Sequence, residues 1–152
     1  MNMQALYVLG AAIEERRGTV RLAMMVFSIA IVSNVLQYSW ATFWPPYEPN
    51  PLFGGISGVV FGLFGYIWMK TWYDPGSGLT LHPTSIFLCL MFYTLCILRT
   101  FPGLSGTFSS MLPHVANTAH TVGLVMGVVY GFVSSGHRFG SVQWLPKDTP
   151  VR

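Results

Sequence analysis

Apolar residues fall into five long runs along the chain, and charged, glycine-rich or proline-rich stretches separate these runs. The first run, from Met1 to Ile13, is too short to cross a bilayer, which takes about 20 residues. It ends in the charged residues 14–18 (EERRG). The next run predicts a helix from about Thr19 to Trp40, which is long enough to cross. We therefore interpret the first run as the inner part of a helix whose outer part is missing.

The third run predicts a helix that is unusually short for a membrane span. It extends roughly from Gly55 to Met69, and a helix of that length rises about 22 Å against a hydrocarbon core of about 30 Å. One of its ends is therefore expected to stop inside the membrane. Lys70, Trp72 and Tyr73 are expected to anchor the far end at the interface, so the sunken end is the one at Gly55.

Two further helices are predicted beyond residues 74–78 (DPGSG), whose composition is typical of a turn. The first runs from about Pro83 to Leu98, and its proline suits the first turn of a helix. The second runs from about Asn117 to Val133, with Asn117 as its N-cap. For Ser33, Asn34 and Gln37, in the second apolar run, cross-helix hydrogen bonds are the expected role.

The segments outside these helices are polar or rich in proline. Residues 40–53 combine prolines with aromatic side chains, which predicts a loop at the level of the lipid headgroups. Residues 99–116 predict another loop. The polar, basic residues 134–152 are expected to form a cytoplasmic tail after a transmembrane domain that covers residues 1–133.

Composition sharpens the class. The chain has 152 residues, of which 52% are hydrophobic and 9% are charged, whereas about 25% are charged in an average domain. So few charges could hardly cover a soluble surface, and an all-α, polytopic transmembrane bundle is predicted. The net charge of +3 is modest, and the basic residues form no patch of the kind that binds nucleic acid. Cys89 and Cys96 are interpreted as small buried residues, with a reactive thiol as the alternative.

The basic residues predict an orientation. The alternating helices place seven of them on one side and only Arg99 on the other, an asymmetry that marks the first side as cytoplasmic. The chain is therefore expected to be an integral, multi-pass protein of the plasma or inner membrane. The seven residues are Arg16, Arg17, Arg21, Lys70, Arg138, Lys147 and Arg152.

A serine and a histidine are the candidate reactive residues. Ser57 lies in the glycine-rich residues 54–62 (GGISGVVFG), and its hydroxyl needs a base to become a nucleophile. Histidine is the usual base near neutral pH. In the predicted topology His120 lies in a helix at the same outer depth as Ser57, whereas His114 lies in a loop and is less constrained. The competing interpretations are packing for the serine-glycine run and a cross-helix hydrogen bond for the histidine.

Glycines at four-residue spacing follow both residues, and such rows let membrane helices approach closely. We expect the two rows to face each other and bring the hydroxyl to the imidazole. No carboxylate is well placed to orient the histidine, which favours a Ser-His dyad over a triad. The backbone N–H of Ser57, at a helix N-terminus, is an expected oxyanion donor. The rows are Gly58 and Gly62 after the serine and Gly123, Gly127 and Gly131 after the histidine.

Three motifs resemble the rhomboid intramembrane serine proteases. They are residues 54–66 (GGISGVVFGLFGY), residues 117–127 (NTAHTVGLVMG) and residues 10–18 (GAAIEERRG), the last similar to the family's Gly-xxx-Glu-xxx-Gly. The resemblance implies cleavage of a membrane-anchored protein within or near its transmembrane segment, with no metal or cofactor. Transmembrane substrates and the bilayer are the implied partners. Displacement of the helix from Pro83 to Leu98, together with the loop before Ser57, is the implied route of substrate entry.

The resemblance also implies roles for single residues. Ser57 matches the nucleophile, and His120 matches the general base. Asn2 falls where the family places an asparagine that stabilises the oxyanion, and Gly55 matches the glycine two residues before the nucleophile. Both residues are therefore expected at the oxyanion or substrate site. Phe61 stands where relatives often carry a tyrosine that packs on the histidine. Three further residues, Gly58, Gly123 and Asn117, are expected to pack near the pair.

The chain departs from the family pattern at its start. The family's core has six helices, of which four and a part are visible here, and the first helix is expected to be missing. A misplaced initiation site, a fragment and a real truncation remain alternatives. A non-catalytic rhomboid-like protein that binds transmembrane clients is the second functional hypothesis. A transporter or channel subunit is disfavoured because no charged residue lies in the middle of a predicted helix.

Overall fold

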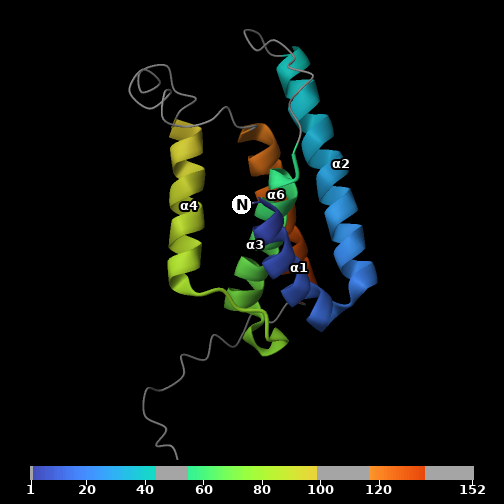
Figure 1. The fold of residues 1–152 in the computed structure, drawn as a ribbon, viewed down its shortest axis with the longest axis vertical. Helices are drawn as coiled ribbons and strands as arrows, with labels where there is room; N and C mark the ends of the chain where they lie inside the picture. Colours follow the sequence, from blue (N-terminus) through green and yellow to red (C-terminus); the bar gives the residue numbers. More distant parts are fainter. Residues whose placement is uncertain (1, 44–54, 99–116, 136–152) are drawn as a thin grey trace, which may run out of the picture.

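The computed structural model describes residues 2–43, 55–98 and 117–135, and this part of the chain is built from helices without a strand (Figure 1). The predicted all-α class is confirmed. The predicted loop at residues 99–116 with His114, the residues 44–54 and the tail beyond residue 135 lie outside the described residues. The elements are α1 (Asn2–Arg17), α2 (Thr19–Phe43), α3 (Ser57–Tyr73), η1 (Pro75–Ser77), α4 (Pro83–Leu98) and α6 (Asn117–Ser134).

The helix boundaries follow the predicted ones closely, with two differences. α4 begins and ends where expected, whereas α2 continues to Phe43, three residues into the predicted loop. α3 begins at Ser57 and continues to Tyr73, four residues past the predicted end. The N–H of Asp74 then donates to the Lys70 carbonyl at 2.9 Å and closes the last turn of α3. A local hydrogen bond of this kind extends a helix beyond the point where the apolar pattern stops.

A glycine separates α1 from α2. Gly18 has a φ of +84°, a conformation that side chains rarely adopt. Its N–H donates to the Glu14 carbonyl at 2.8 Å, and the Thr19 hydroxyl donates to the Glu14 carboxylate at 2.7 Å. These bonds satisfy the end of α1 while the chain reverses into α2.

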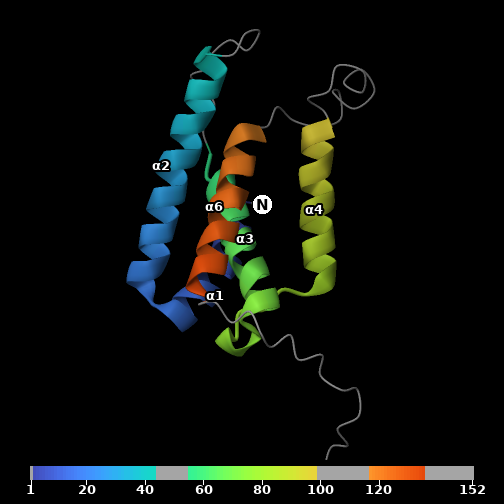
Figure 2. The same ribbon diagram turned by 180° about the vertical axis from the view of Figure 1, so that it is seen from behind.

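α3 is the central helix of the bundle. It lies between α1 and α6, while α2 and α4 stand on opposite sides of this stack (Figures 1 and 2). Its side chains from Phe61 to Ile67 are all buried, and its contact with α6 is the most extensive in the described structure. One apolar cluster joins Ile13 of α1 and Ile29 of α2 to Leu63 of α3. The first residue of α3 is therefore held on an element that can move little.

Among the described residues one helix is long and apolar enough to cross a bilayer, and it covers Thr19–Trp40 of α2. Its large apolar side chains remain exposed along much of its length, as Val20, Phe27 and Ile31 illustrate with 72%, 68% and 62% exposure. α4 is a shorter apolar helix. Exposed apolar faces of this size fit contact with lipid.

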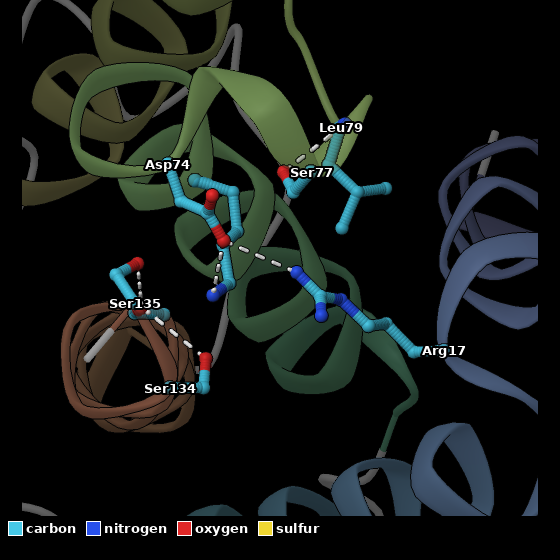
Figure 3. A network of polar contacts seen from close by, with 8 residues as sticks. Arg17, Asp74, Ser77, Leu79, Ser134 and Ser135 are labelled. Atoms are coloured by element: carbon cyan, nitrogen blue, oxygen red, sulfur yellow. Dashed lines mark hydrogen bonds and ion pairs between the residues drawn. The ribbon is translucent and has the colours of Figure 1, made fainter.

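Lys70 is buried inside the protein at the far end of α3, whereas Trp72 and Tyr73, the other two expected anchors, are exposed. The Lys70 side chain is fully buried at 0% exposure, and its Nζ donates to Asp74 Oδ2 at 3.2 Å. Arg17 of α1 reaches the same carboxylate oxygen at 3.3 Å, so one carboxylate joins two cations (Figure 3). Burying the ammonium without this partner would be costly. The basic ends of α1 and α3 thus lie together, as the alternating scheme predicted, but through ion pairs inside the protein.

Candidate active site

Ser57 is the first residue of α3. Ile56 precedes it and has no side-chain oxygen that could cap the helix. The backbone N–H groups of a first helical turn have no acceptor within the helix, and they carry the positive end of the helix dipole. A serine at this position therefore combines a hydroxyl with backbone donors that favour negative charge.

His120 comes from the first turn of α6 and meets Ser57 directly. The His120 Nε2 atom lies 2.8 Å from the Ser57 Oγ atom, and the imidazole is 3% exposed. α3 and α6 run in the same direction, so the beginnings of both helices lie at the same end of the pair (Figures 1 and 2). The sequence predicted that these two side chains would meet, and the distance bears this out.

The glycine rows face each other as predicted. A Cβ on Gly123 would overlap the Gly58 carbonyl, and a Cβ on Gly127 would overlap the Gly62 carbonyl. Both obstacles are backbone atoms, which cannot turn aside as a side chain can. The two helices are therefore packed backbone against backbone, as in other small-residue membrane contacts, and this packing sets the distance between Ser57 and His120.

Phe61 supports the imidazole from one turn below Ser57. The ring centroids of Phe61 and His120 lie 4.7 Å apart with an interplanar angle of 33°, as expected for the residue at this position. The other ring nitrogen, His120 Nδ1, is buried and has no hydrogen-bond partner in the described structure. The described carboxylates are engaged elsewhere: Glu14 accepts from Thr19, Glu15 from Arg16, and Asp74 from Arg17 and Lys70.

Comparison with known proteins identifies the family of the chain. Residues 1–137 match the family model of the Rhomboid domain. The chain belongs to the rhomboid family. It is 31% identical over 136 residues to "Rhomboid protease GlpG" of Klebsiella pneumoniae strain 342, and equally to that of Klebsiella pneumoniae subsp. pneumoniae. These matches cover 90% of this chain and 43% of the length of each relative. Membership of this family makes the protein an integral membrane protein.

Two predicted oxyanion residues of this rhomboid chain lie differently with respect to the pair. Gly55 precedes α3 and is exposed, and a Cβ there would stand 3.6 Å from the Ser57 Oγ atom. Asn2 is the exposed first residue of α1, and no hydrogen bond joins it to Ser57 or His120 in the described structure. Gly55 thus borders the hydroxyl, whereas the role of Asn2 stays a prediction.

Asn117 does not act as the expected N-cap of α6. It is the first helical residue, and its Nδ2 donates across helices to the Cys96 carbonyl in α4 at 2.7 Å. Gln37 of α2 caps α6 instead: its Oε1 accepts a hydrogen bond from the Ala119 N–H at 3.0 Å. The capping role expected for Asn117 is therefore filled by a residue of another helix. Cross-helix bonding was expected for Gln37.

The same expectation fails for two neighbours of Gln37 in α2. The bonds that the structure describes for Ser33 and Asn34 run back to the Ala30 carbonyl, at 3.4 and 2.7 Å. Ser33 is nevertheless fully buried, because its side chain packs against the glycine row at Gly58. A hydroxyl in an apolar helix can satisfy itself on its own backbone, so its spacing did not reveal which bond it makes.

Sequence reasoning missed two residues next to the pair. Tyr93 of α4 places its ring 5.8 Å from that of Phe61, and its hydroxyl lies 2.9 Å from the hydroxyl of Thr121. Thr121 directly follows His120 in the chain. A single tyrosine in a helix rich in apolar residues gives no local indication of its partner. The one indication in the sequence was the Tyr93 hydroxyl, because polar groups in membrane helices normally face another helix.

Proposed function

We propose that the protein is an intramembrane serine endopeptidase that cleaves membrane-anchored proteins with a Ser57–His120 dyad. The observation that carries the proposal is the 2.8 Å separation of Ser57 Oγ and His120 Nε2 on two helices whose backbones touch. Family membership supports it, because the similar proteins of Klebsiella pneumoniae are named rhomboid proteases.

In the proposed reaction Ser57 Oγ attacks the carbonyl carbon of the scissile peptide while its proton passes to His120 Nε2. The tetrahedral intermediate collapses with cleavage of the C–N bond, and His120 returns the proton to the leaving amine. Water then gives a proton to His120 and attacks the ester. The second collapse releases the new carboxyl group and restores the Ser57 hydroxyl. The Ser57 hydroxyl, the His120 ring, the substrate and water account for every proton moved and every bond made or broken in these steps.

The oxyanion is proposed to form near the N-terminus of α3. The N–H of Ser57 is a donor in the right place, because the uncapped first turn points its amides out of the helix. Gly55 keeps the space next to the hydroxyl free of a side chain. Asn2 is proposed as a second donor on the strength of the family pattern alone.

The topology proposed with this activity is multi-pass. α1 and α3 bring their basic ends together, because Arg17 and Lys70 both pair with Asp74, and the positive-inside rule places this end in the cytoplasm. Ser57, at the other end of α3, then lies toward the outer face of a plasma or inner membrane. Residues 1–133 are proposed as the membrane domain and residues 134–152 as a cytoplasmic tail.

The test is cleavage of a transmembrane model substrate by the purified chain in proteoliposomes. Ser57→Ala and His120→Ala should each abolish cleavage, because either change removes one half of the proton transfer. A fluorophosphonate should add its mass to Ser57 in the unmodified protein but not in Ser57→Ala. Ser28→Ala is a matched control, since Ser28 lies on α2 and bonds to the Met25 carbonyl and to Tyr130.

Folded protein that neither cleaves the substrate nor reacts with the fluorophosphonate would contradict the protease. The non-catalytic alternative would then gain support if the chain still bound transmembrane segments. Ser57→Ala separates the two proposals. Loss of cleavage in a folded Ser57→Ala protein supports the protease, whereas an effect on client stability that persists in Ser57→Ala supports the client-binding protein, which does not need the hydroxyl.

A further inference from the structure

Tyr93 links α4 to the pair of helices that carries the dyad. Its ring packs against Phe61 of α3, with centroids 5.8 Å apart and an interplanar angle of 55°. Its hydroxyl lies 2.9 Å from the Thr121 hydroxyl of α6. One side chain of α4 therefore contacts α3 through its ring and α6 through its hydroxyl.

The direction of the hydrogen bond follows from its neighbours. The Thr121 hydroxyl donates its only proton to the Asn117 carbonyl at 2.9 Å. It then has lone pairs left with which to accept, so the Tyr93 O–H is the donor. Two contacts therefore restrain the Tyr93 side chain: its ring packs against Phe61, and its hydroxyl bonds to Thr121.

Phe61 needs such support because it has no polar atom of its own. Packing alone decides the orientation of its ring, and the His120 ring lies on it at 4.7 Å. Since His120 Nδ1 has no described hydrogen-bond partner, the known restraints on the imidazole are its bond to Ser57 and this aromatic contact. In a catalytic triad a carboxylate orients the histidine ring, and no described carboxylate contacts His120.

These contacts form a closed circuit through three helices. It runs from His120 to Phe61, from Phe61 to Tyr93, and from Tyr93 to Thr121, which is covalently joined to His120. The circuit connects Tyr93 to the imidazole without a direct contact between the two side chains.

We infer that Tyr93 is a positioning residue for the proposed protease, acting on His120 through Phe61 and Thr121. The inference rests on the proposed function. It assigns to α4 a part in organising the dyad: the imidazole is aligned with Ser57 when Tyr93 is docked between Phe61 and Thr121. Tyr93 itself touches neither Ser57 nor His120 among the described contacts.

The first measurement is the rate at which a fluorophosphonate labels Ser57 in the full chain, well below the unfolding midpoint and normalised to folded protein. This rate reports on Ser57 activation without a transmembrane substrate. Tyr93→Leu should lower it at least about tenfold, since small misplacements of reacting groups cost up to about 100-fold. Tyr93→Phe keeps the ring and should rescue most of the rate. A role confined to stability would lower the unfolding midpoint and leave the normalised rate unchanged.

Two variants of α4 serve as matched controls. Phe87→Leu removes an aromatic ring that is 66% exposed on the same helix. Thr94→Val removes a hydroxyl that bonds to the Leu90 carbonyl within α4. Neither should change the labelling rate. Thr121→Val removes the bond to Tyr93 and also the bond to the Asn117 carbonyl. Adding Tyr93→Phe to Thr121→Val should therefore cost nothing further, because the Tyr93–Thr121 bond is already lost.

The second measurement does not depend on activity. In protein with isotope-labelled histidine, the ring carbon–proton resonance of His120, assigned with His120→Gln, should shift in Tyr93→Leu and stay in place in Phe87→Leu. An unchanged labelling rate in Tyr93→Leu would overturn the inference in an active protein. If the unmodified chain reacts with no fluorophosphonate, the protease proposal fails separately. The resonance then decides alone: a shift supports positioning by Tyr93, and no shift overturns it.

Discussion

α3 meets α6 through glycine backbones and meets α4 through long side chains. At the first contact Gly58 and Gly62 lie against Gly123 and Gly127 with no room for a Cβ. At the second contact Phe61 and Phe64 reach side chains of α4, including Ile86, Cys89, Leu90 and Tyr93, while the helix backbones stay apart (Figures 1 and 2). A backbone contact has one geometry, whereas a side-chain contact can be remade at several distances.

The two contacts also differ in how much they bury. α3 is buried along most of its length, whereas α4 buries Cys96 and leaves Phe87, Leu88, Met91 and Phe92 between 44% and 66% exposed. The described hydrogen bonds from α4 to α6 are those of Tyr93 and of the Cys96 carbonyl. Ser57 and His120, the proposed nucleophile and base, thus stand on the firm contact, and α4 is the side that can yield. This supports, as a proposal, substrate entry by displacement of α4.

The largest effect is expected where the firm contact is broken. In Gly123→Val the new side chain would meet the Gly58 carbonyl, which belongs to the backbone and cannot move away. We expect a loss of more than about 4 kcal/mol of unfolding free energy, with no reaction at Ser57. Denaturant titration in bicelles measures the first and fluorophosphonate labelling the second.

The matched control is Gly76→Ala, because a Cβ at Gly76 meets nothing within 4 Å. It should change the unfolding free energy by less than about 0.5 kcal/mol. If Gly123→Val unfolded at the same denaturant concentration as Gly76→Ala, backbone packing would not be what holds α3 to α6.

A large but smaller effect is expected at Phe61, where the two contacts meet. This ring is 6% exposed and contacts the rings of both His120 and Tyr93. Phe61→Ala should cost about 3 kcal/mol through the cavity it leaves, and it should slow labelling of Ser57 because His120 loses its support. Phe27→Ala on α2, where the ring is 68% exposed, should affect neither quantity much. If the two variants lost the same amount of unfolding free energy, neighbouring side chains must have moved into the cavity left by Phe61.

A moderate effect is expected on the yielding side. Asn117→Leu removes the bond to the Cys96 carbonyl, and hydrogen bonds between membrane helices average about 0.6 kcal/mol, with a maximum of about 1.7. Without this bond α4 should also move away from α6 more often. Cys96 of α4, which is 2% exposed, should then react faster with a maleimide. Asn34→Leu is the control, because Asn34 bonds to Ala30 within α2. Unchanged Cys96 reactivity in Asn117→Leu would show that this bond does not hold α4.

The firm contact could be predicted from the sequence because its determinants are local and repeated. Glycines at four-residue spacing in two runs specify a close approach, and this register brings Ser57 to His120. Pro83 and Asn117 marked where α4 and α6 begin, and the charged stretch at residues 14–18 marked where α1 ends. Each of these signs depends on the residue itself and little on its distant surroundings.

The contacts that escaped prediction depend on partners far along the chain. α3 runs on to Tyr73 while Asp74 pairs with Lys70 and with Arg17, 57 residues earlier. Asn117 looked like a helix cap but bonds to Cys96, 21 residues away. Tyr93 gave no indication of Thr121, because one hydroxyl in an apolar helix fits many partners. The side-chain contact of α4 is built from such single bonds, which is why the sequence revealed it least.

The smallest effect on stability is expected at Gly55, on the firm side but outside the helix contact. A Cβ there would lie 3.6 Å from the Ser57 Oγ atom, which is an ordinary contact, and Gly55 has no positive φ that would strain another residue. Gly55→Ala should therefore change the unfolding free energy by less than about 0.5 kcal/mol. It should still slow cleavage, because the methyl group occupies space beside the hydroxyl where the oxyanion is proposed to form.

Cleavage of a transmembrane substrate by Gly55→Ala should fall in kcat more than it rises in KM, because an interaction made in the transition state is lost. Gly76→Ala again provides a glycine control in open space. A Gly55→Ala protein that cleaves normally would place the oxyanion on the other side of Ser57. If Gly55→Ala unfolded the protein instead, the residue before α3 would be part of the packed contact between α3 and α6. The firm contact would then begin at Gly55, ahead of the first residue of the helix.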